Sequence, residues 1–445
     1  MYYYKPLKSI CSRSKRFDLR RVTLSSLILI ALLGSIGVRF SNAHTPDTAV
    51  SSYSLETLVG LALQRNPYLL AARTVVDGAE GGVLEAGRLD NPSLNLRYAS
   101  DQIFNNEGES NLGIGFAQKF PITQRLKLER WIAEDSVRLA EAEIVERELI
   151  LRKEVEHAVY ELAATLAERA LSDQILALNQ EWLSFIESGI ERGEASQVDA
   201  NRLSLEIYTM EETRHELISQ EIVSKAKIRQ LCGFHHLDSF DLDFELSLPP
   251  ELPQLPNFGR LHMELHPSYV VGKQLLEIAE KNLSLAKAAR WTDIEVEVFY
   301  REERGVDTPN GLGRDRFFGV GLSIPLPLHS QGHGAIAQRK AAVDRMLWEL
   351  RATESKLLND AAVQRLLVGH LYEQALEYHE DITPILASNQ KLMREAYTSG
   401  QISLTDLFRM QEKELHIKSV QQAHLVELEE SLSHWRSATG LETTY

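Results

Sequence analysis

Gly115-Phe-Ala-Gln-Lys-Phe-Pro121 has a counterpart 204 residues later in the chain, Gly319-Val-Gly-Leu-Ser-Ile-Pro325. Both stretches alternate between larger, mostly apolar residues and small or polar ones, and both end on a proline. Alternation with a period of two is typical of a β-strand with one apolar face, and a proline marks the end of such a strand. The sequence therefore predicts the same strand twice.

Three further pairs of matching stretches occur in the same order along the chain. Asn66-Pro67 matches His266-Pro267 at an offset of 200 residues. Arg192-Gly193-Glu-Ala-Ser-Gln-Val-Asp199 is answered by Ser399-Gly400-Gln-Ile-Ser-Leu-Thr-Asp406, and Leu231-Cys-Gly233 by Ala438-Thr-Gly440, both at an offset of 207. Ordered matches with a slowly drifting offset indicate an internal repeat.

Each repeat is expected to contain a helix, a strand pair, a very long helix and a return helix. The repeats span 44–233 and 262–445, and a proline-rich linker, 234–261, joins them. The expected strands are 93–100 and 111–120, then 293–301 and 316–324. The expected long helices are 124–191 and 331–399, with a kink at Pro384, and the expected return helices are 196–231 and 403–439. The polar stretches 101–110 and 302–315 are predicted to be exposed hairpin loops.

The long helices carry the spacing of a coiled coil, with apolar residues alternately three and four positions apart. The seams are Val155, Val159, Leu162 and Leu166; Ile175, Leu178, Trp182 and Phe185; and Leu425, Leu428, Leu432 and Trp435. At 1.5 Å per residue each long helix spans roughly 100 Å. A return helix covers only about half of that length, so we expect the helices before the strands, 55–89 and 265–290, to cover the rest.

Alternation in the four strands separates an apolar face from a small or polar face. In the first strand Leu94, Leu96 and Tyr98 oppose Asn95 and Arg97. Strands of eight to ten residues are long enough to cross a bilayer when tilted. Two soluble hairpins, each with one face on a core, remain an alternative. Four strands cannot close a barrel, so a membrane barrel requires two chains with eight strands or three chains with twelve.

The chain has 445 residues and a net charge of -15, and this acidity argues against a nucleic-acid partner. Residues 1–43 combine basic residues, an apolar run and Ser41-Asn42-Ala43, as a cleaved signal peptide does. A retained N-terminal anchor is the alternative. Removal of this segment leaves a net charge of -22 and one thiol, Cys232, so neither an intramolecular disulfide nor a lipidated N-terminal cysteine is expected.

No catalytic signature is found in the sequence: it lacks a Walker loop, a nucleophile elbow and a zincin motif. We therefore expect no enzyme activity and no cofactor. Three histidine pairs have the spacing of possible metal ligands: His262 with His266, His329 with His333, and His235 with His236. No cysteine or carboxylate cluster accompanies them, so we expect no metal site and predict a capping or surface role for His262 and His266.

These motifs together resemble the TolC-like outer-membrane factors, and within them the compact CzcC-like heavy-metal efflux members. The resemblance covers essentially all of the chain after residue 43. It implies a mainly α fold with a small β part: a TolC-like α-helical barrel continuous with a 12-stranded outer-membrane β-barrel, formed by a homotrimer with four strands per chain. It also implies a location in the cell outer membrane of a Gram-negative envelope, extending into the periplasm.

The resemblance further implies a passive exit duct that works with a periplasmic adaptor and an inner-membrane pump of the resistance-nodulation-division (RND) type, here for heavy-metal cations. Drug efflux or type I protein secretion through the same duct is the alternative, and a periplasmic coiled-coil adaptor is a third reading. The chain lacks the acylated cysteine of many members of the family.

The resemblance assigns roles to three groups of residues. Arg192, Gly193 and Glu194, with Ser399, Gly400 and Gln401, would form the periplasmic tips where an adaptor docks. Pro121 and Pro325 would mark the barrel-to-helix corners. Asp406 would line an acidic constriction, with Asp199 as its counterpart, although Arg409 stands where a second acid is expected. Helix capping is the alternative role for both aspartates, because a carboxylate suits the first turn of a helix.

Overall fold

In the computed structural model the chain divides into two units, Met1–Ala49 and Val50–Tyr445. The structure describes residues 51–103, 107–193, 196–307, 311–328 and 331–441, all within the second unit. The expected signal peptide, 1–43, lies outside the described residues. Across the described ranges, no helix is both long enough and apolar enough to span a membrane.

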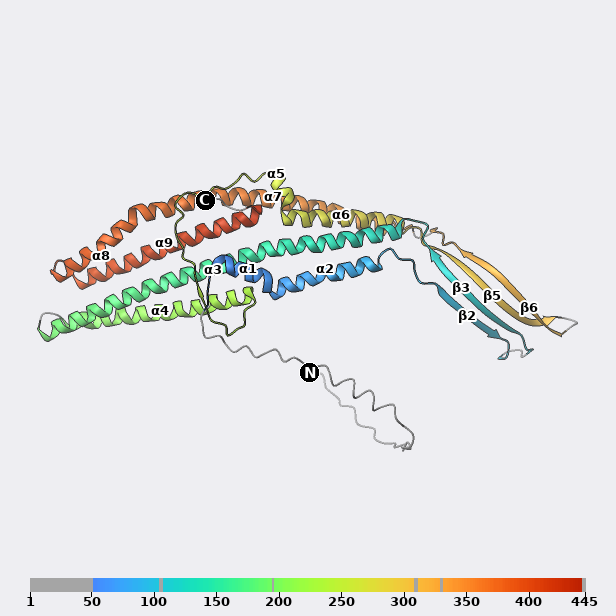
Figure 1. Cartoon of the computed structure of the whole chain (residues 1–445), viewed down its shortest axis with the longest axis horizontal. Helices are drawn as coiled ribbons and strands as arrows, with labels where there is room; N and C mark the ends of the chain where they lie inside the picture. The colour runs from blue at the N-terminus through green and yellow to red at the C-terminus, as the bar shows by residue number, and fades with distance from the viewer. Residues whose placement is uncertain (1–50, 104–106, 194–195, 308–310, 329–330, 442–445) are drawn as a thin grey trace, which may run out of the picture. The chain divides into compact units, whose positions relative to one another are not determined.

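The described chain is mostly helical, with one four-stranded sheet and one short strand pair (Figure 1). The elements of the first half are β1 (Ser51–Tyr53), α1 (Leu55–Arg65), α2 (Pro67–Glu85), β2 (Ser93–Ser100), β3 (Ser110–Phe120), α3 (Arg125–Glu191) and α4 (Gln197–Cys232). Those of the second half are β4 (Phe240–Leu242), α5 (Arg260–Leu265), α6 (Pro267–Ala288), β5 (Ile294–Asp307), β6 (Gly311–Ser323), α7 (His333–Glu377), the π-helical turn η1 (Tyr378–Ile382), α8 (Thr383–Thr398) and α9 (Leu404–Thr439).

Asn66 and His266 begin α2 and α6 in the same way. The Asn66 side-chain oxygen accepts hydrogen bonds from the backbone N–H groups of Tyr68 and Leu69, at 2.9 and 3.0 Å. His266 Nδ1 accepts from the N–H of Ser268 at 3.2 Å. A proline follows each cap, at the position where its missing N–H costs nothing. The capping role predicted for His266 is therefore confirmed.

The four strands form one antiparallel sheet in the order β2-β3-β5-β6, so β3 and β5 join the two hairpins. The prediction that 302–315 is a loop is wrong, because β5 and β6 continue their pairing to Asp307 opposite Gly311. Glu302 lies 3.2 Å from Arg316 and 3.5 Å from Arg314. These charges pair across the strands, so a polar sequence here extends the hairpin instead of ending it.

The two long helices differ from each other. α3 is continuous over 67 residues, as expected. The second is interrupted by η1, which ends two residues before Pro384, and the chain changes direction there (Figure 1). Because proline has no N–H, the carbonyl of Glu380 has no α-helical donor, and a π-helical turn accommodates this loss. The expected single helix 331–399 is thus replaced by α7, η1 and α8.

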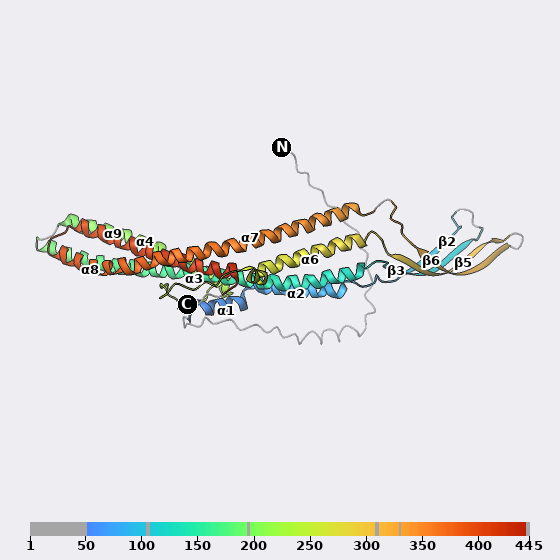
Figure 2. The ribbon, with the colours of Figure 1, turned by 90° about the horizontal axis from the view of Figure 1, so that it is seen from above.

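Each long helix is covered by two shorter ones, as expected. α4 and α2 pack along different parts of α3, and α9 and α6 pack along α7 (Figure 2). α3 also contacts α6 and α9, which joins the two halves.

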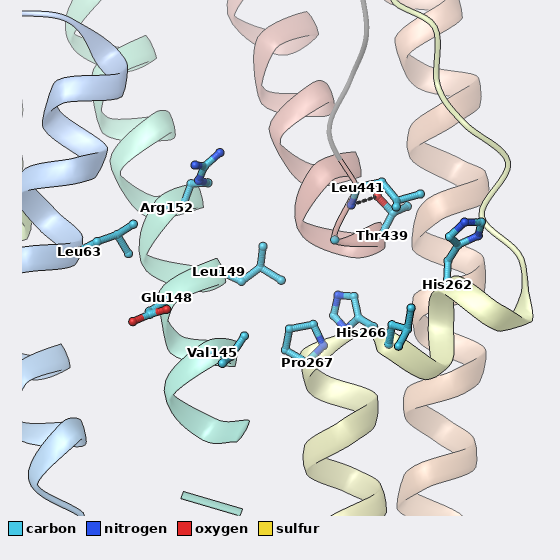
Figure 3. Close-up of a pocket in the computed structure, with 12 residues that line it drawn as sticks. Leu63, Val145, Glu148, Leu149, Arg152, His262, His266, Pro267, Thr439 and Leu441 are labelled. Carbon is cyan, nitrogen blue, oxygen red and sulfur yellow. Dashed lines mark hydrogen bonds between the residues drawn. The ribbon is translucent and has the colours of Figure 1, made fainter. Parts of the chain in front are cut away.

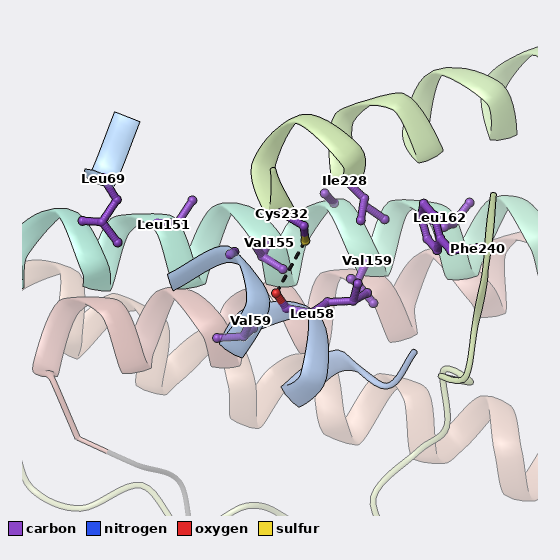
Figure 4. Packing of buried hydrophobic residues seen from close by; sticks show 12 residues of the cluster. Leu58, Val59, Leu69, Leu151, Val155, Val159, Leu162, Ile228, Cys232 and Phe240 are labelled. Carbon is purple, nitrogen blue, oxygen red and sulfur yellow. Dashed lines mark hydrogen bonds between the residues drawn. The ribbon is translucent and has the colours of Figure 1, made fainter. Parts of the chain in front are cut away.

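The largest core cluster lies where α1, α3, α4 and β4 meet (Figure 4). The α3 seam residues Val155, Val159 and Leu162 are fully buried in it. Cys232 lies in the same cluster as a free thiol, and its Sγ is 3.5 Å from the carbonyl oxygen of Leu58. One seam residue departs from the prediction: Phe185 is 50% exposed and contacts Trp182 edge-on.

Candidate functional site

The turns that end the two helical hairpins both contain a glycine with a left-handed backbone. Gly193 has φ 76° and Gly400 has φ 72°. Their N–H groups donate to Ile190 and Tyr397 at 2.9 Å each, which closes the C-terminal ends of α3 and α8. A Cβ at either position would meet no atom within 4 Å, so the positive φ angle, and not crowding, requires glycine.

The polar residues predicted for the two tips surround these glycines. Arg192, Ser399 and Gln401 are exposed, and the N–H of Gln401 donates to Ala396 at 2.8 Å. Glu194 lies outside the described residues. The described tip residues therefore form short, exposed polar turns.

The structure brings the two hairpins together just before their tips. Trp182 and Ile186 of α3 and Leu203 of α4 form a buried cluster with Met393 of α8 and Leu407 of α9. The ring of Trp182 meets that of Tyr397 edge-on, with 4.9 Å between centroids. Trp182 was predicted to lie in a seam, but its partner Tyr397, on a helix of the other half, was not.

Asp406 lies in a capping box at the start of α9. The Ser403 hydroxyl donates to Asp406 Oδ2 at 2.6 Å, and the N–H of Asp406 donates to Ser403 Oγ at 3.2 Å. The bond from the Ser403 hydroxyl lowers the pKa of Asp406, and the nearby charge of Arg409 acts in the same direction. The capping role that was left open for Asp406 is thus present, and both Asp406 and Arg409 are exposed.

Asp199 lies in the first turn of α4 and is half-buried. Its charge also acts on the other hairpin. Burial of Tyr397 raises the pKa of that tyrosine most, and the charge of Asp199 raises it further. The two predicted aspartates therefore differ. Asp406 binds its own helix cap, whereas the charge of Asp199 acts on a tyrosine of the second half.

Pro121 and Pro325 lie where the sheet gives way to the helices. Pro121 follows β3 directly and α3 begins at Arg125, whereas α7 begins eight residues after Pro325. Arg125 contacts Asp293, just before β5, at 2.6 Å and Glu129 at 2.8 Å. This ion pair fastens the corner of the first half to the strand of the second.

A buried polar cluster between α3 and α9 was not predicted. Arg436 contacts Glu156 at 3.0 Å, and its guanidinium lies 3.4 Å from the Tyr160 hydroxyl. Beside it, the rings of His157 and His434 meet edge-on at 4.8 Å, and His157 Nδ1 lies 3.5 Å from Glu430. The spacing of apolar residues in this stretch of α3 indicated only an apolar seam. It did not predict the polar contacts of α3 with α9.

The described residues include no group of three or more histidine, cysteine or acidic side chains that could hold a metal ion. A pocket of about 420 Å³ lies between α1, α3, α5 and the end of α9 (Figure 3). Several of its polar residues already serve the fold. His266 caps α6 and lies 3.0 Å from the Ser437 carbonyl oxygen, Glu148 binds Arg73 at 2.9 Å, and the N–H of Leu441 donates to Thr439.

Comparisons with known proteins agree with this geometry. Residues 58–233 match the family model described as "Outer membrane efflux protein". Among solved structures, the outer membrane protein VceC from Vibrio cholerae is 15% identical, with a TM-score of 0.68 over 87% of this chain and 96% of that one.

Two other solved structures are similar. The MtrE outer membrane channel of Neisseria gonorrhoeae, in its open state, is 14% identical, with a TM-score of 0.68 over 87% of this chain and 88% of that one. CusC, described in connection with transmembrane channel formation, is 14% identical, with a TM-score of 0.67 over 86% and 91%. No curated protein matches the chain.

Residues 58–233 thus match the outer membrane efflux protein family, and the fold of both halves is that of the TolC-like outer-membrane channels. The matching family model and the similar solved structures are described as outer-membrane proteins.

Proposed function

We propose that three copies of this chain form a passive exit duct, with a 12-stranded barrel in the outer membrane and a helical tube in the periplasm. The observation that carries the proposal is the open four-stranded sheet. Its outer strands, β2 and β6, each have one edge without a partner strand in the part of the chain that the structure describes. Unpaired backbone groups are very costly in lipid, so other chains must supply the missing neighbours.

The exposed face of the sheet supports a position in lipid. The apolar even-numbered residues in the middle of β2 and β6 are all at least 62% exposed. Among them, Leu96 is 69%, Phe318 is 76% and Val320 is 67% exposed. Soluble chains rarely expose so continuous an apolar surface. Beyond Tyr300 the same face turns charged, at Glu302, Arg314 and Arg316, as a strand does where it leaves the bilayer.

The outer surface of α4 supports assembly of the helical part. Ala200, Leu203 and Ile207 face α3 and are buried, whereas Val198, Leu205 and Tyr208 lie on the opposite side and are 64, 70 and 62% exposed. Residues spaced by seven and three form a single helical stripe. A neighbouring copy would cover this stripe in a closed tube.

Heavy-metal cations are the cargo we propose, with a periplasmic adaptor and an RND-type pump as partners. The compact CzcC-like sequence pattern and the acidic composition support this choice. A strain without the chain should become sensitive to heavy-metal salts and regain resistance when it is restored. Sensitivity to drugs alone, or loss of a secreted protein, would favour the two alternative cargoes.

The oligomeric state tests the duct. Detergent-solubilised protein extracted from outer membranes should have the mass of three chains by light scattering, and the trimer should resist mild heating in detergent. A monomer would overturn the proposal, because four strands cannot close a barrel. A protein recovered from the periplasm without detergent would favour the adaptor instead.

A further inference from the structure

Two phenylalanines lie on the small and polar face of the sheet. The pairing places Asn95, Gly115, Phe299 and Gly319 in one row across the four strands, and Arg97, Gly113, Arg301 and Phe317 in the next. The interior of a membrane barrel is expected to be polar. These two rings are therefore the exception that requires an explanation.

The ring of Phe299 lies directly over a glycine of the neighbouring strand. A Cβ added at Gly319 would come within 2.6 Å of Phe299 Cζ and 3.0 Å of Cε1, so only glycine leaves room for the ring. On the other side of β5, Gly115 is the direct partner of Phe299. The ring thus covers Gly319, and a glycine pairs with Phe299 on each of the two neighbouring strands.

Arg301 lies beside Phe299 on β5 and opposite Phe317 on β6. Its guanidinium carbon lies 5.5 Å from the centroid of Phe299, within the range of a cation–π contact. Phe317 is its direct cross-strand partner and is 47% exposed. Arg301 also contacts Glu303 at 3.4 Å. We call Phe299, Arg301 and Phe317 the luminal band.

The luminal band lies at the depth of the apolar outer face. The residues on the other face at this level are Ile114, Tyr300 and Phe318, which pair with one another across the strands. The charged residues Glu302 and Arg316 follow only one pair further toward the hairpin tip. The band is therefore inside the part of the sheet that would cross the bilayer.

We propose that the luminal band narrows the bore of the assembled duct within the outer membrane and limits the size of solutes that pass. This inference rests on the proposed function, because three copies of the band must face a common lumen. Large side chains that point into a barrel reduce its free cross-section. The band would act as a second restriction, separate from the helical tips.

Cysteine accessibility tests this constriction. Ser323→Cys places a thiol on the same face, on the helix side of the band, and Ala99→Cys places one on the tip side. A bulky, membrane-impermeant maleimide is added outside intact cells. Its labelling of Ser323→Cys should be slow and should rise roughly tenfold or more when Phe299→Ala and Phe317→Ala widen the bore.

Three controls make the result specific. Phe318→Ala removes an adjacent ring from the lipid face and should leave the rate unchanged. Ala99→Cys should label equally fast in every background, which also shows that the sheet has folded. Phe317→Trp, which enlarges the band, should slow the labelling of Ser323→Cys further.

The outcomes separate this inference from the duct itself. If a small polar maleimide labels Ser323→Cys and the bulky reagent labels it equally fast with and without the phenylalanines, the duct stands and the constriction is wrong. If neither reagent labels Ser323→Cys while both label Ala99→Cys, this face does not line an aqueous lumen, and the proposed duct fails with it.

Discussion

Asp406 combines a helix cap with a proposed place at the duct entrance, and the structure provides a way to separate the two. Ser403 and Asp406 form the same capping box, but only Asp406 carries charge. If a ring of carboxylates sets the field at the entrance, Asp406→Ala should change single-channel conductance or its block by cations in planar bilayers.

Ser403→Ala is the matched control for this prediction. It removes the hydroxyl that binds Asp406, so it weakens the cap by about 1 kcal/mol while leaving the charge in place. Conductance and cation block should stay those of the unmodified protein. If Asp406→Ala and Ser403→Ala gave the same conductance and the same cation block, Asp406 would serve only as part of the helix cap.

The histidine pair between α3 and α9 predicts a loss of stability in mild acid. Burial, then His434 and Lys153, lower the pKa of His157 to about 4, and burial also lowers the pKa of His434. The charged groups around the pair are Lys153, Glu156 and Glu161 on α3, Glu430 on α9 and Asp360 on α7.

The direction of the effect follows from the sign of the shift. A histidine whose folded pKa lies below its unfolded value near 6.5 stabilises the fold above pH 6.5, and this contribution is lost as the pH falls toward 4. For His157 the full loss is at most about 3 kcal/mol. Burial raises the pKa of Glu430, so protonation of that carboxyl offsets part of the loss at the acidic end.

His157→Gln should flatten this dependence. The midpoint of thermal unfolding, measured in detergent between pH 7.5 and 5, should fall less in the variant than in the unmodified protein. His236→Gln changes an exposed histidine after α4 and should leave the profile as it was. Parallel profiles for His157→Gln and the unmodified protein would rule out a contribution from the pair.

The turns between helices depend on backbone conformation at one residue each. Gly400→Ala forces a side chain into the left-handed region and should cost roughly 1–2 kcal/mol of unfolding free energy. Gly369 provides the contrast, because it lies inside α7 with no atom within 4 Å of an added Cβ. Gly369→Ala should stabilise the helix by roughly 0.5–1 kcal/mol.

Chemical unfolding of the two variants in parallel measures both effects. The two glycine-to-alanine substitutions should change the free energy of unfolding in opposite directions. A general effect of replacing glycine by alanine could not produce that result. A stabilising Gly400→Ala would mean that the turn adopts another conformation in the assembled protein.

Periodicity predicted most elements because it reports on each element by itself. The alternation of β3 and the 67 residues of α3 follow from local spacing. The extension of β5 and β6 was not predicted, because its residues are polar. Their charges pair only once the register places Arg316 opposite Glu302. The interruption at η1 was predicted as a kink at Pro384, but its π-helical form depends on how the helix absorbs the lost hydrogen bond.

Assembly is the property of the whole molecule that the exposed surfaces predict. Leu205→Glu and Tyr208→Glu place charges in the exposed stripe of α4 and should shift detergent-solubilised protein from trimer toward monomer. Ser204→Glu adds the same charge to an exposed position beside the stripe and should leave the trimer intact. Light scattering gives the masses. An unchanged trimer in both stripe variants would place the subunit contact elsewhere.

The sequence alone determined the order of the elements, the two faces of the strands and the glycine turns, because these depend on residues close together in the chain. Only the tertiary structure decided which helices of the two halves meet. Arg436 and Glu156 are 280 residues apart, and Trp182 meets Tyr397 across two different hairpins. No local period records such contacts, since they depend on how long helices pack. The same reason applies to the luminal band: alternation assigns Phe299 and Arg301 to one face, but the register of β5 against β6 puts Phe317 beside them.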